Sequence, residues 1–180
     1  MTPNSFGFLD FNHMMTLPSL SGDYHEFSLD SEPGIHRCFT ISQSASPIKL
    51  PVFSKQMLII DSGYHWHQFI FFHQPYFLTV VFDGNDAIVL SQFDIVETLD
   101  SNDGGIAVGK DRYLKVLFHP DGRYHRMGEE ALEKALRHRE LTHLERGRSY
   151  SVSEKLIKTY SIRLNQLEKR IRLLSSTNRF

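Results

Sequence analysis

The sequence predicts an α+β protein, an antiparallel sheet region followed by C-terminal helices. Between residues 35 and 127, short segments rich in aromatic and β-branched residues alternate with turn residues. So many short strands at close spacing are typical of a barrel or a sandwich. The 14 Phe and 7 Tyr suit a β core. From Glu129 to Ser175, apolar residues recur at helical spacing, which predicts that this part of the chain is helical.

Composition limits the classes of function. The 180 residues suffice for one domain with a core, and a net charge of −1 argues against a general electrostatic grip on nucleic acid. Cys38 is the one cysteine, so no intramolecular disulfide forms, and we expect a cytoplasmic protein. The sequence has neither a signal-peptide pattern nor 18 consecutive apolar residues, so we expect no membrane association.

Three segments follow from these patterns. Residues 1–31 read as an irregular N-terminal arm with scattered Phe, residues 32–147 as the sheet region with the first helices, and residues 148–180 as a long C-terminal helix. The expected strands are 35–42, 48–53, 56–60, 64–73, 76–82, 87–96, 113–118 and 123–127.

The helical half is expected in three pieces. Residues 129–139 form the first helix, and residues 141–146 form a short second helix that ends at Gly147. A long helix then runs from Ser151 to Ser175, where Ser151 and Glu154 make a capping box. Its apolar residues repeat at 3-4 spacing, a heptad seam that packs on the sheet or pairs with a second copy as a homodimer.

Acidic residues gather around the last strands. Asp94 lies near the end of one predicted strand, Asp111 begins the next, and Glu129 and Glu130 open a helix. Carboxylates on neighbouring strands and at a helix start can converge on one point, and such a point often holds a divalent metal. The alternative is that the aspartates flank strands and the glutamates complement the helix dipole.

The order of these residues resembles the FomD-like nucleotide hydrolase family. The resemblance lies in Asp94-Ile, Asp111-x-Tyr-Leu-x-Val, Pro120-Asp-Gly and Glu129-Glu-x-Leu-Glu-x-Ala, and it covers about residues 35–144. It implies an antiparallel β-barrel followed by C-terminal helices. It also implies hydrolysis of a phosphoanhydride in a nucleoside di- or triphosphate, with Mg, Mn or Co as the divalent metal.

The resemblance implies roles for individual residues. Metal ligands would be Asp94, Asp111 and Glu130, and catalytic residues would be Asp111, Lys115 and Glu129. Substrate-binding residues would be Arg37, Trp66, Tyr113 and Lys115.

The sequence also departs from the family pattern. In the family pattern, the strand that begins at the position of Asp111 carries a second acidic residue, but this position is Lys115 here. Gly128 and Ala131 likewise occupy two positions that are acidic at the helix start of the family pattern. If Tyr113 and Lys115 share a strand face with Asp111, an ammonium enters the acidic cluster. The alternative function is therefore a catalytically degenerate module that binds a nucleotide, RNA or a protein.

Two histidine patterns give weaker hypotheses. Strand alternation puts His65 and His67 on one face and Trp66 on the other, a spacing that can bind zinc but is more often two surface histidines beside a buried Trp. Cys38 lies two residues from His36, which is compatible with an activated thiol, although a structural cysteine is the commoner case.

Overall fold

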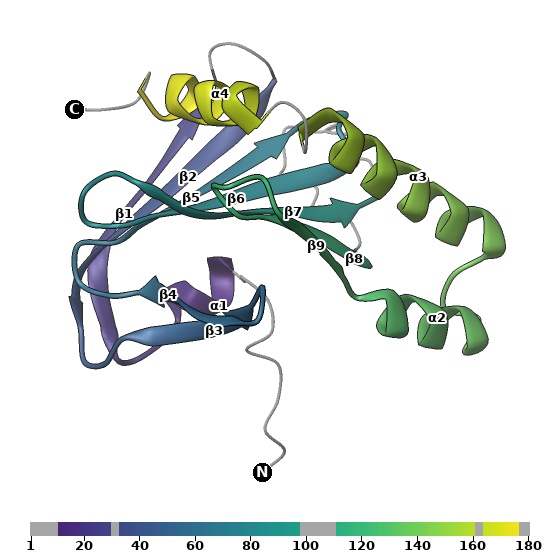
Figure 1. Ribbon diagram of the computed structural model, residues 1–180, viewed down its shortest axis with the longest axis horizontal. Helices are drawn as coiled ribbons and strands as arrows, with labels where there is room; N and C mark the ends of the chain where they lie inside the picture. Colours follow the sequence, from purple (N-terminus) through teal and green to yellow (C-terminus); the bar gives the residue numbers. More distant parts are fainter. Residues whose placement is uncertain (1–10, 30–32, 98–110, 161–163, 177–180) are drawn as a thin grey trace.

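The computed structural model describes residues 11–29, 33–97, 111–160 and 164–176. In this part of the chain, a seven-stranded sheet curves over a two-stranded hairpin (Figure 1). The sheet contains, in spatial order, β1 (Leu20–Ser28), β2 (Gly34–Ser44), β5 (His65–Phe71), β6 (Tyr76–Phe82), β7 (Ile88–Val96), β8 (Asp111–Phe118) and β9 (Tyr124–Met127), each antiparallel to its neighbours. The hairpin is β3 (Ile48–Val52) with β4 (Lys55–Ile60).

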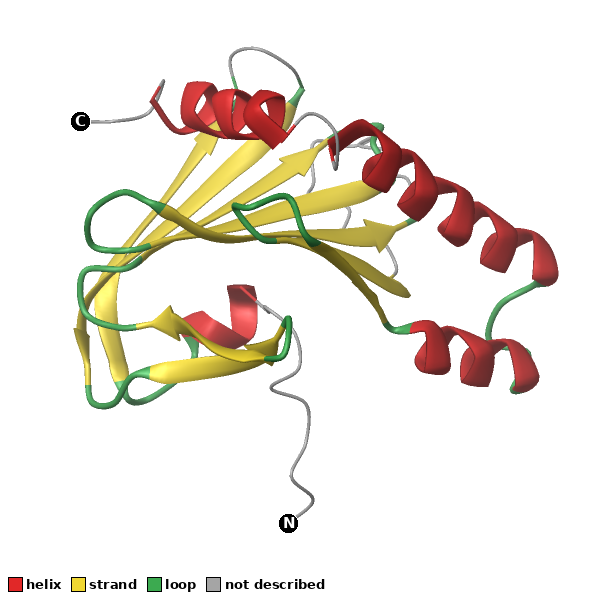
Figure 2. Cartoon of the chain, in the orientation of Figure 1, coloured by secondary structure: helices red, strands yellow, loops and turns green. Residues whose placement is uncertain are grey.

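The sheet is open. Among the described residues, β1 and β9 are its two edges and do not pair with each other. The expected closed barrel is therefore wrong for this part of the chain, while the mostly antiparallel sheet and the C-terminal helices are confirmed. The sheet is nevertheless strongly curved, and it bends around β3 and β4 (Figure 2).

Both faces of the sheet are covered, which explains why its central strands are nearly continuously apolar rather than alternating. One core lies under the helices, and it includes Phe69, Leu78, Phe93 and Val116. The other lies on the concave face against α1 (Phe11–Met15) and the β3–β4 hairpin, and it includes Phe11, Ile41, Leu50, Trp66, Val81 and Leu117. Successive strand residues therefore contribute to opposite cores.

The C-terminal helices lie on the convex side of the sheet (Figure 1). They are α2 (Glu129–Arg137), α3 (His143–Tyr160) and α4 (Leu164–Ser176). The expected single helix from Ser151 to Ser175 is wrong, because α3 begins eight residues before Ser151 and a separate α4 follows it. None of the helices among the described residues combines the length and apolar character of a membrane span.

The start of α3 explains this difference. Thr142 and Glu145 form the capping box: the Thr142 backbone N–H donates to Glu145 Oε2 at 2.6 Å, and the Glu145 N–H donates to Thr142 Oγ1 at 3.2 Å. Gly147 therefore lies inside α3 and does not end a helix. The predicted boundary between residues 147 and 148 also falls inside this helix.

The heptad seam packs on the sheet. Ile157 and Tyr160 of α3 and Leu167 and Ile171 of α4 are buried in the helix-side core. Arg170 also donates to Tyr160 Oη at 3.0 Å, which ties the two helices together. These seam residues therefore pack within one chain, and a homodimer through this region stays a prediction.

The N-terminal segment is more ordered than expected. Residues 11–28, predicted as part of an irregular arm, form α1 and the edge strand β1, whereas residues 1–10 lie outside the described residues. The sequence did not predict β1, because the strand is largely exposed and shows no clear alternation of polar and apolar residues. The predicted strands from β2 to β9 are confirmed with small shifts at their ends.

Candidate functional site

Asp94 and Lys115 lie on the concave face of the sheet. Asp94 stands between Phe93 and Ile95, both in the helix-side core, so strand alternation directs its side chain to the other face. Lys115 stands likewise between two residues of that core and is the direct cross-strand partner of Asp94. The two side chains form an ion pair, with 13 % of Asp94 and 15 % of Lys115 exposed.

Gln92 adds to this pair. Its amide Nε2 donates to both carboxylate oxygens of Asp94, at 3.0 and 2.9 Å. The carboxylate therefore accepts hydrogen bonds from an ammonium and an amide at once. These donors stabilise its ionised form.

A row of polar residues continues from Gln92 across the sheet. We call it the polar ladder, and it consists of Glu26, Arg37, Gln68, Thr79 and Gln92, which are successive cross-strand partners on β1, β2, β5, β6 and β7. Thr79 and Gln92 are completely buried, and the described part of the chain offers Thr79 Oγ1 no hydrogen-bond partner. Buried polar groups are costly, so a row of them inside a sheet is a feature to explain by function.

Arg37 and Glu26 form the end of the polar ladder on β2 and β1. Arg37 Nε donates to Glu26 Oε2 at 2.8 Å, and 16 % of the Arg37 side chain is exposed. Hydrogen bonds from Tyr24 and Arg37 lower the pKa of Glu26 below its ordinary value. The guanidinium is thus held on the same face as Lys115, on a different strand pair.

Tyr113 does not join Lys115. Alternation alone would put Tyr113 and Lys115 on one face, but Tyr113 has φ = 67°, which breaks the alternation of β8. Its ring packs against the helix-side core, and its hydroxyl donates to Glu140 at 3.0 Å. Asp111 begins β8 and pairs with Val96, which places its backbone beside the end of β7.

The first turn of α2 contacts an arginine rather than the Asp94–Lys115 pair. Glu129 accepts a hydrogen bond from Arg126 Nε at 2.9 Å, and Arg126 in turn contacts Glu154 of α3 at 2.5 Å. Glu130 is exposed. Gly128 precedes the helix with φ = 89°, and a Cβ there would overlap the carbonyl oxygen of Tyr113.

Among the side chains that the structure describes, Asp94, Glu129 and Glu130 do not form a divalent metal site of the kind the resemblance implies. Mg²⁺, Mn²⁺ and Co²⁺ require several converging oxygen or nitrogen ligands. Asp94 is already engaged by Lys115 and Gln92, and the backbone at Gly128 leaves no room for an acidic side chain. Within the described ranges, no three His, Cys, Asp or Glu side chains are grouped closely enough to hold a metal.

Trp66, predicted to bind substrate, is a core residue with 1 % of its surface exposed. Its indole N–H donates to the Ile59 carbonyl at 2.8 Å, which fixes the ring between the sheet and β4. It lies on the concave face with Lys115, but on a different row of cross-strand partners, opposite Val81.

Histidines gather on the opposite face of β2 and β5. His67 contacts His36 Nε2 through Nδ1 at 2.8 Å and Cys38 Sγ through Nε2 at 3.5 Å, so both of its ring nitrogens are engaged. Burial lowers the pKa of His36 to about 4 and raises the pKa of Cys38 to about 11. The thiol is therefore neutral at physiological pH, which disfavours its role as a nucleophile.

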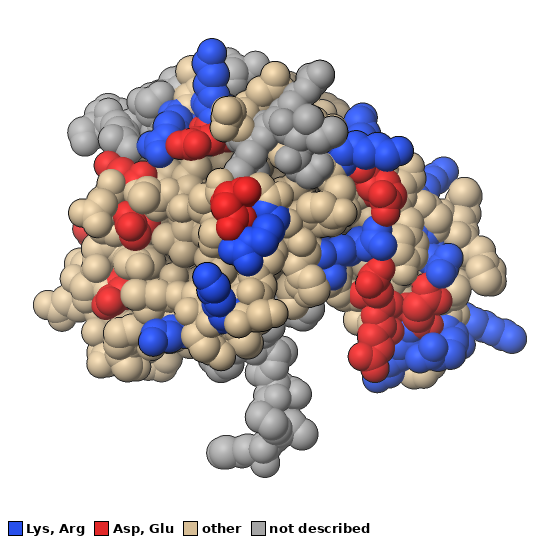
Figure 3. All heavy atoms as spheres, viewed as in Figure 1, with Lys and Arg blue, Asp and Glu red and all other residues tan. Residues whose placement is uncertain are grey.

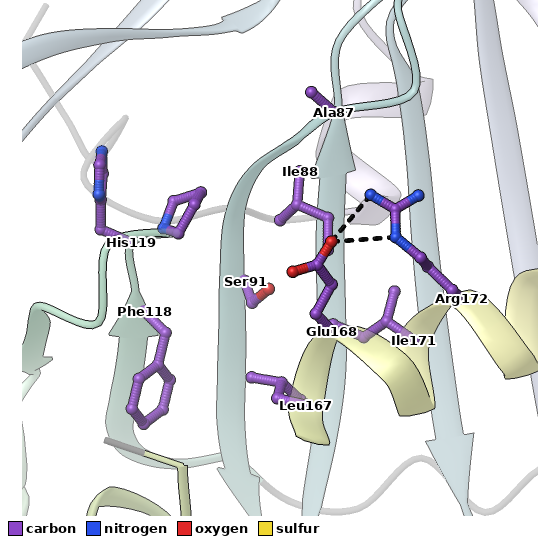
Figure 4. A pocket seen from close by; sticks show the side chains of 10 residues that line it. Ala87, Ile88, Ser91, Phe118, His119, Leu167, Glu168, Ile171 and Arg172 are labelled. Atoms are coloured by element: carbon purple, nitrogen blue, oxygen red, sulfur yellow. Dashed lines mark hydrogen bonds and ion pairs between the residues drawn. The ribbon is translucent and has the colours of Figure 1, made fainter. Parts of the chain in front are cut away.

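A separate pocket of about 210 Å³ lies between α4 and the β7–β8 region, on the helix side (Figure 4). Leu167 and Ile171 form its apolar wall, Ser91 lies at its floor, and Glu168 accepts two hydrogen bonds from Arg172 at its rim. Drug-sized ligands occupy pockets of roughly 300 Å³ or more, so this one is small for a nucleotide.

Surface charge gives the RNA-binding alternative little support. On the face seen in Figure 3, acidic and basic side chains are mixed over α2 and α3. Arg126 with Glu129 and Arg146 with Glu133 are ion pairs of this region. An RNA-binding face is expected to carry clustered positive charge instead.

Sequence reasoning missed the polar ladder. Thr79 interrupts an otherwise apolar strand, which is a signal that could have found it, whereas β5 and β7 carry other polar residues besides Gln68 and Gln92. Their alignment depends on strand register, which the sequence does not give.

Comparisons with known proteins identify the fold. No family model matches the sequence, and no curated protein does. The complex of FomD with CDP has a similar structure, with a TM-score of 0.53 and 10% sequence identity over 81% of this chain and 78% of that chain. The phosphatase SC4828, solved with the non-hydrolysable nucleotide GPCP, gives a TM-score of 0.48 and 12% identity over 78% and 82%. The chain therefore has the FomD-like fold, a mostly antiparallel sheet followed by C-terminal helices.

Proposed function

We propose that this chain binds the phosphoanhydride of a nucleoside di- or triphosphate on the concave face of its sheet, next to Lys115 and Arg37. The position of Lys115, an ammonium group on the concave face, carries the proposal. Ammonium and guanidinium groups are the usual protein partners of phosphate. FomD has been solved with CDP, and the shared fold supports a nucleotide as the ligand.

Each of the two cations already has an acidic partner, Asp94 for Lys115 and Glu26 for Arg37. Each pair is neutral overall, so long-range attraction of phosphate is weak. Direct hydrogen bonds must then provide the affinity. An ammonium has three N–H donors and a guanidinium five, so each group can keep its carboxylate and still donate to a phosphate oxygen.

Titration calorimetry with CDP, GDP, ADP and their triphosphates tests this proposal. We expect binding of at least one of them, with affinity reduced about tenfold or more by Arg37→Gln, since a hydrogen bond to a charged group is lost. Lys134→Met, which removes an exposed cation on α2, is the matched control and should leave affinity unchanged. Failure of every nucleotide to bind the folded protein would contradict the proposal.

Hydrolysis of the bound phosphoanhydride is the second candidate function. Asp111 pairs with Val96, so Asp94 and Asp111 belong to the same end of the β7–β8 pair, and this favours it. For this second function, the proposed catalytic residues are Asp111, Lys115 and Glu129. Phosphate release is to be measured with Mg²⁺, Mn²⁺ or Co²⁺, and Asp111→Asn should abolish it. If no phosphate is released with any of these ions, only the proposal of nucleotide binding remains.

A further inference from the structure

The charge balance around Asp94 differs from that of an acidic metal site. Two or more carboxylates in one place repel a phosphoanhydride, and a divalent cation is what normally overcomes this repulsion. Here the direct cross-strand partner of Asp94 is Lys115, and the two groups form an ion pair. The negative charge of Asp94 is thus balanced by the chain itself.

The geometry also keeps this balance fixed. Gln92 donates to both oxygens of Asp94, so the carboxylate is held by two neighbouring side chains. At the helix start, Gly128 has φ = 89° and the Tyr113 carbonyl lies where its Cβ would be. An acidic side chain at Gly128 is therefore excluded by the backbone, and Glu129 is already paired with Arg126.

We propose that Lys115 takes the place of a divalent cation at this site, so that nucleotide binding needs no metal. The inference rests on the proposed binding of a phosphoanhydride and adds its cofactor requirement. In this arrangement the ammonium holds Asp94 with one N–H and offers another to a phosphate oxygen. Arg37 lies on the same face, in the polar ladder on β2.

The test is calorimetric titration of the full chain with CDP and, separately, with inorganic pyrophosphate. Each titration is done in EDTA and again in Mg²⁺ and in Mn²⁺. We expect affinity in EDTA to lie within about twofold of that with either ion. Lys115→Met should lower affinity in EDTA about tenfold or more, because it removes the cation and leaves Asp94 uncompensated.

Two further variants separate charge from folding. Lys115→Arg keeps the positive charge and should retain metal-independent binding, whereas Lys115→Asp should lose binding in EDTA. Lys134→Met is the control for a lysine outside the site. Near-ultraviolet circular dichroism of each variant establishes that it is folded before its affinity is compared.

The possible outcomes are distinct. Wild-type binding that appears only with a divalent ion would overturn this inference and leave the proposed function standing. Equal affinity of wild type and folded Lys115→Met in EDTA would also overturn it. No binding of CDP or pyrophosphate under any condition, together with no binding of the other nucleotides, would instead contradict the proposed function itself.

Discussion

Asp94 on β7 and Lys115 on β8 are direct cross-strand partners whose side chains pair on the concave face of the sheet. This relationship sets the local chemistry, because it places an ammonium directly beside the Asp94 carboxylate. It also couples function to stability, since each member of a partly buried ion pair is unfavourable without the other.

A double-mutant cycle measures how much the Asp94–Lys115 pair contributes to the free energy of unfolding. Lys115→Met should lower the free energy of unfolding by about 2 kcal/mol, because it leaves the Asp94 carboxylate partly buried without its cation. Adding Asp94→Asn should recover part of this loss, since the uncompensated charge is removed. Urea unfolding of the single and double variants measures both effects. Simple additivity of the two substitutions would show that the pair contributes no coupling.

The glycine before α2 should be intolerant of any side chain. Gly128→Ala should destabilise the protein by about 2 kcal/mol or more, because alanine is strained at φ = 89° and its Cβ would overlap the Tyr113 carbonyl. Gly147 provides the matched control, as it lies within α3 with nothing within 4 Å of an added Cβ. Gly147→Ala should stabilise the protein by about 1 kcal/mol through helix propensity. Equal effects of the two substitutions in urea unfolding would refute this account.

The heptad seam of α4 should behave as core. Ile171 is completely buried, so Ile171→Ala should cost about 2–4 kcal/mol of unfolding free energy. Leu173→Ala, at a position that is 61% exposed on the same helix, should change it by about 0.5 kcal/mol or less. The loss at Ile171 should not depend on protein concentration. A midpoint that rises with concentration would point to pairing between copies instead.

The pH dependence of stability should carry a contribution from His36. Burial lowers the pKa of His36 to about 4 in the folded protein, against 6.5 for an unperturbed histidine. Between these values the unfolded chain binds the proton and the folded chain does not, so stability falls as pH falls from 6.5 towards 4. The loss is on the order of 3 kcal/mol.

Unfolding of wild type and His36→Gln across this pH range measures the contribution. The variant should lack this part of the slope, whereas His143→Gln, which replaces an exposed histidine, should keep it. Parallel curves for wild type and His36→Gln would mean that the imidazole is protonated equally in both states.

Local patterns determined much of the architecture. The aromatic and β-branched runs from β2 to β9 and the start of α2 at Glu129 could be read from the sequence, because strand and helix periodicity are short-range properties. The exposed edge strand β1 and the division into α3 and α4 could not. The first has few buried residues to mark it, and two capping boxes, at Thr142 and at Ser151, competed for one helix start.

From the sequence alone, Lys115, Gly128 and Ala131 could be recognised as departures from an acidic pattern, whereas Asp94 keeps its carboxylate. Three features depend on tertiary packing: Lys115 faces Asp94, Tyr113 turns to the other core, and the sheet is open within the described residues. Strand register and a single positive φ fix these outcomes. Both arise from packing between segments distant in sequence, and a one-residue shift in register would reverse every face.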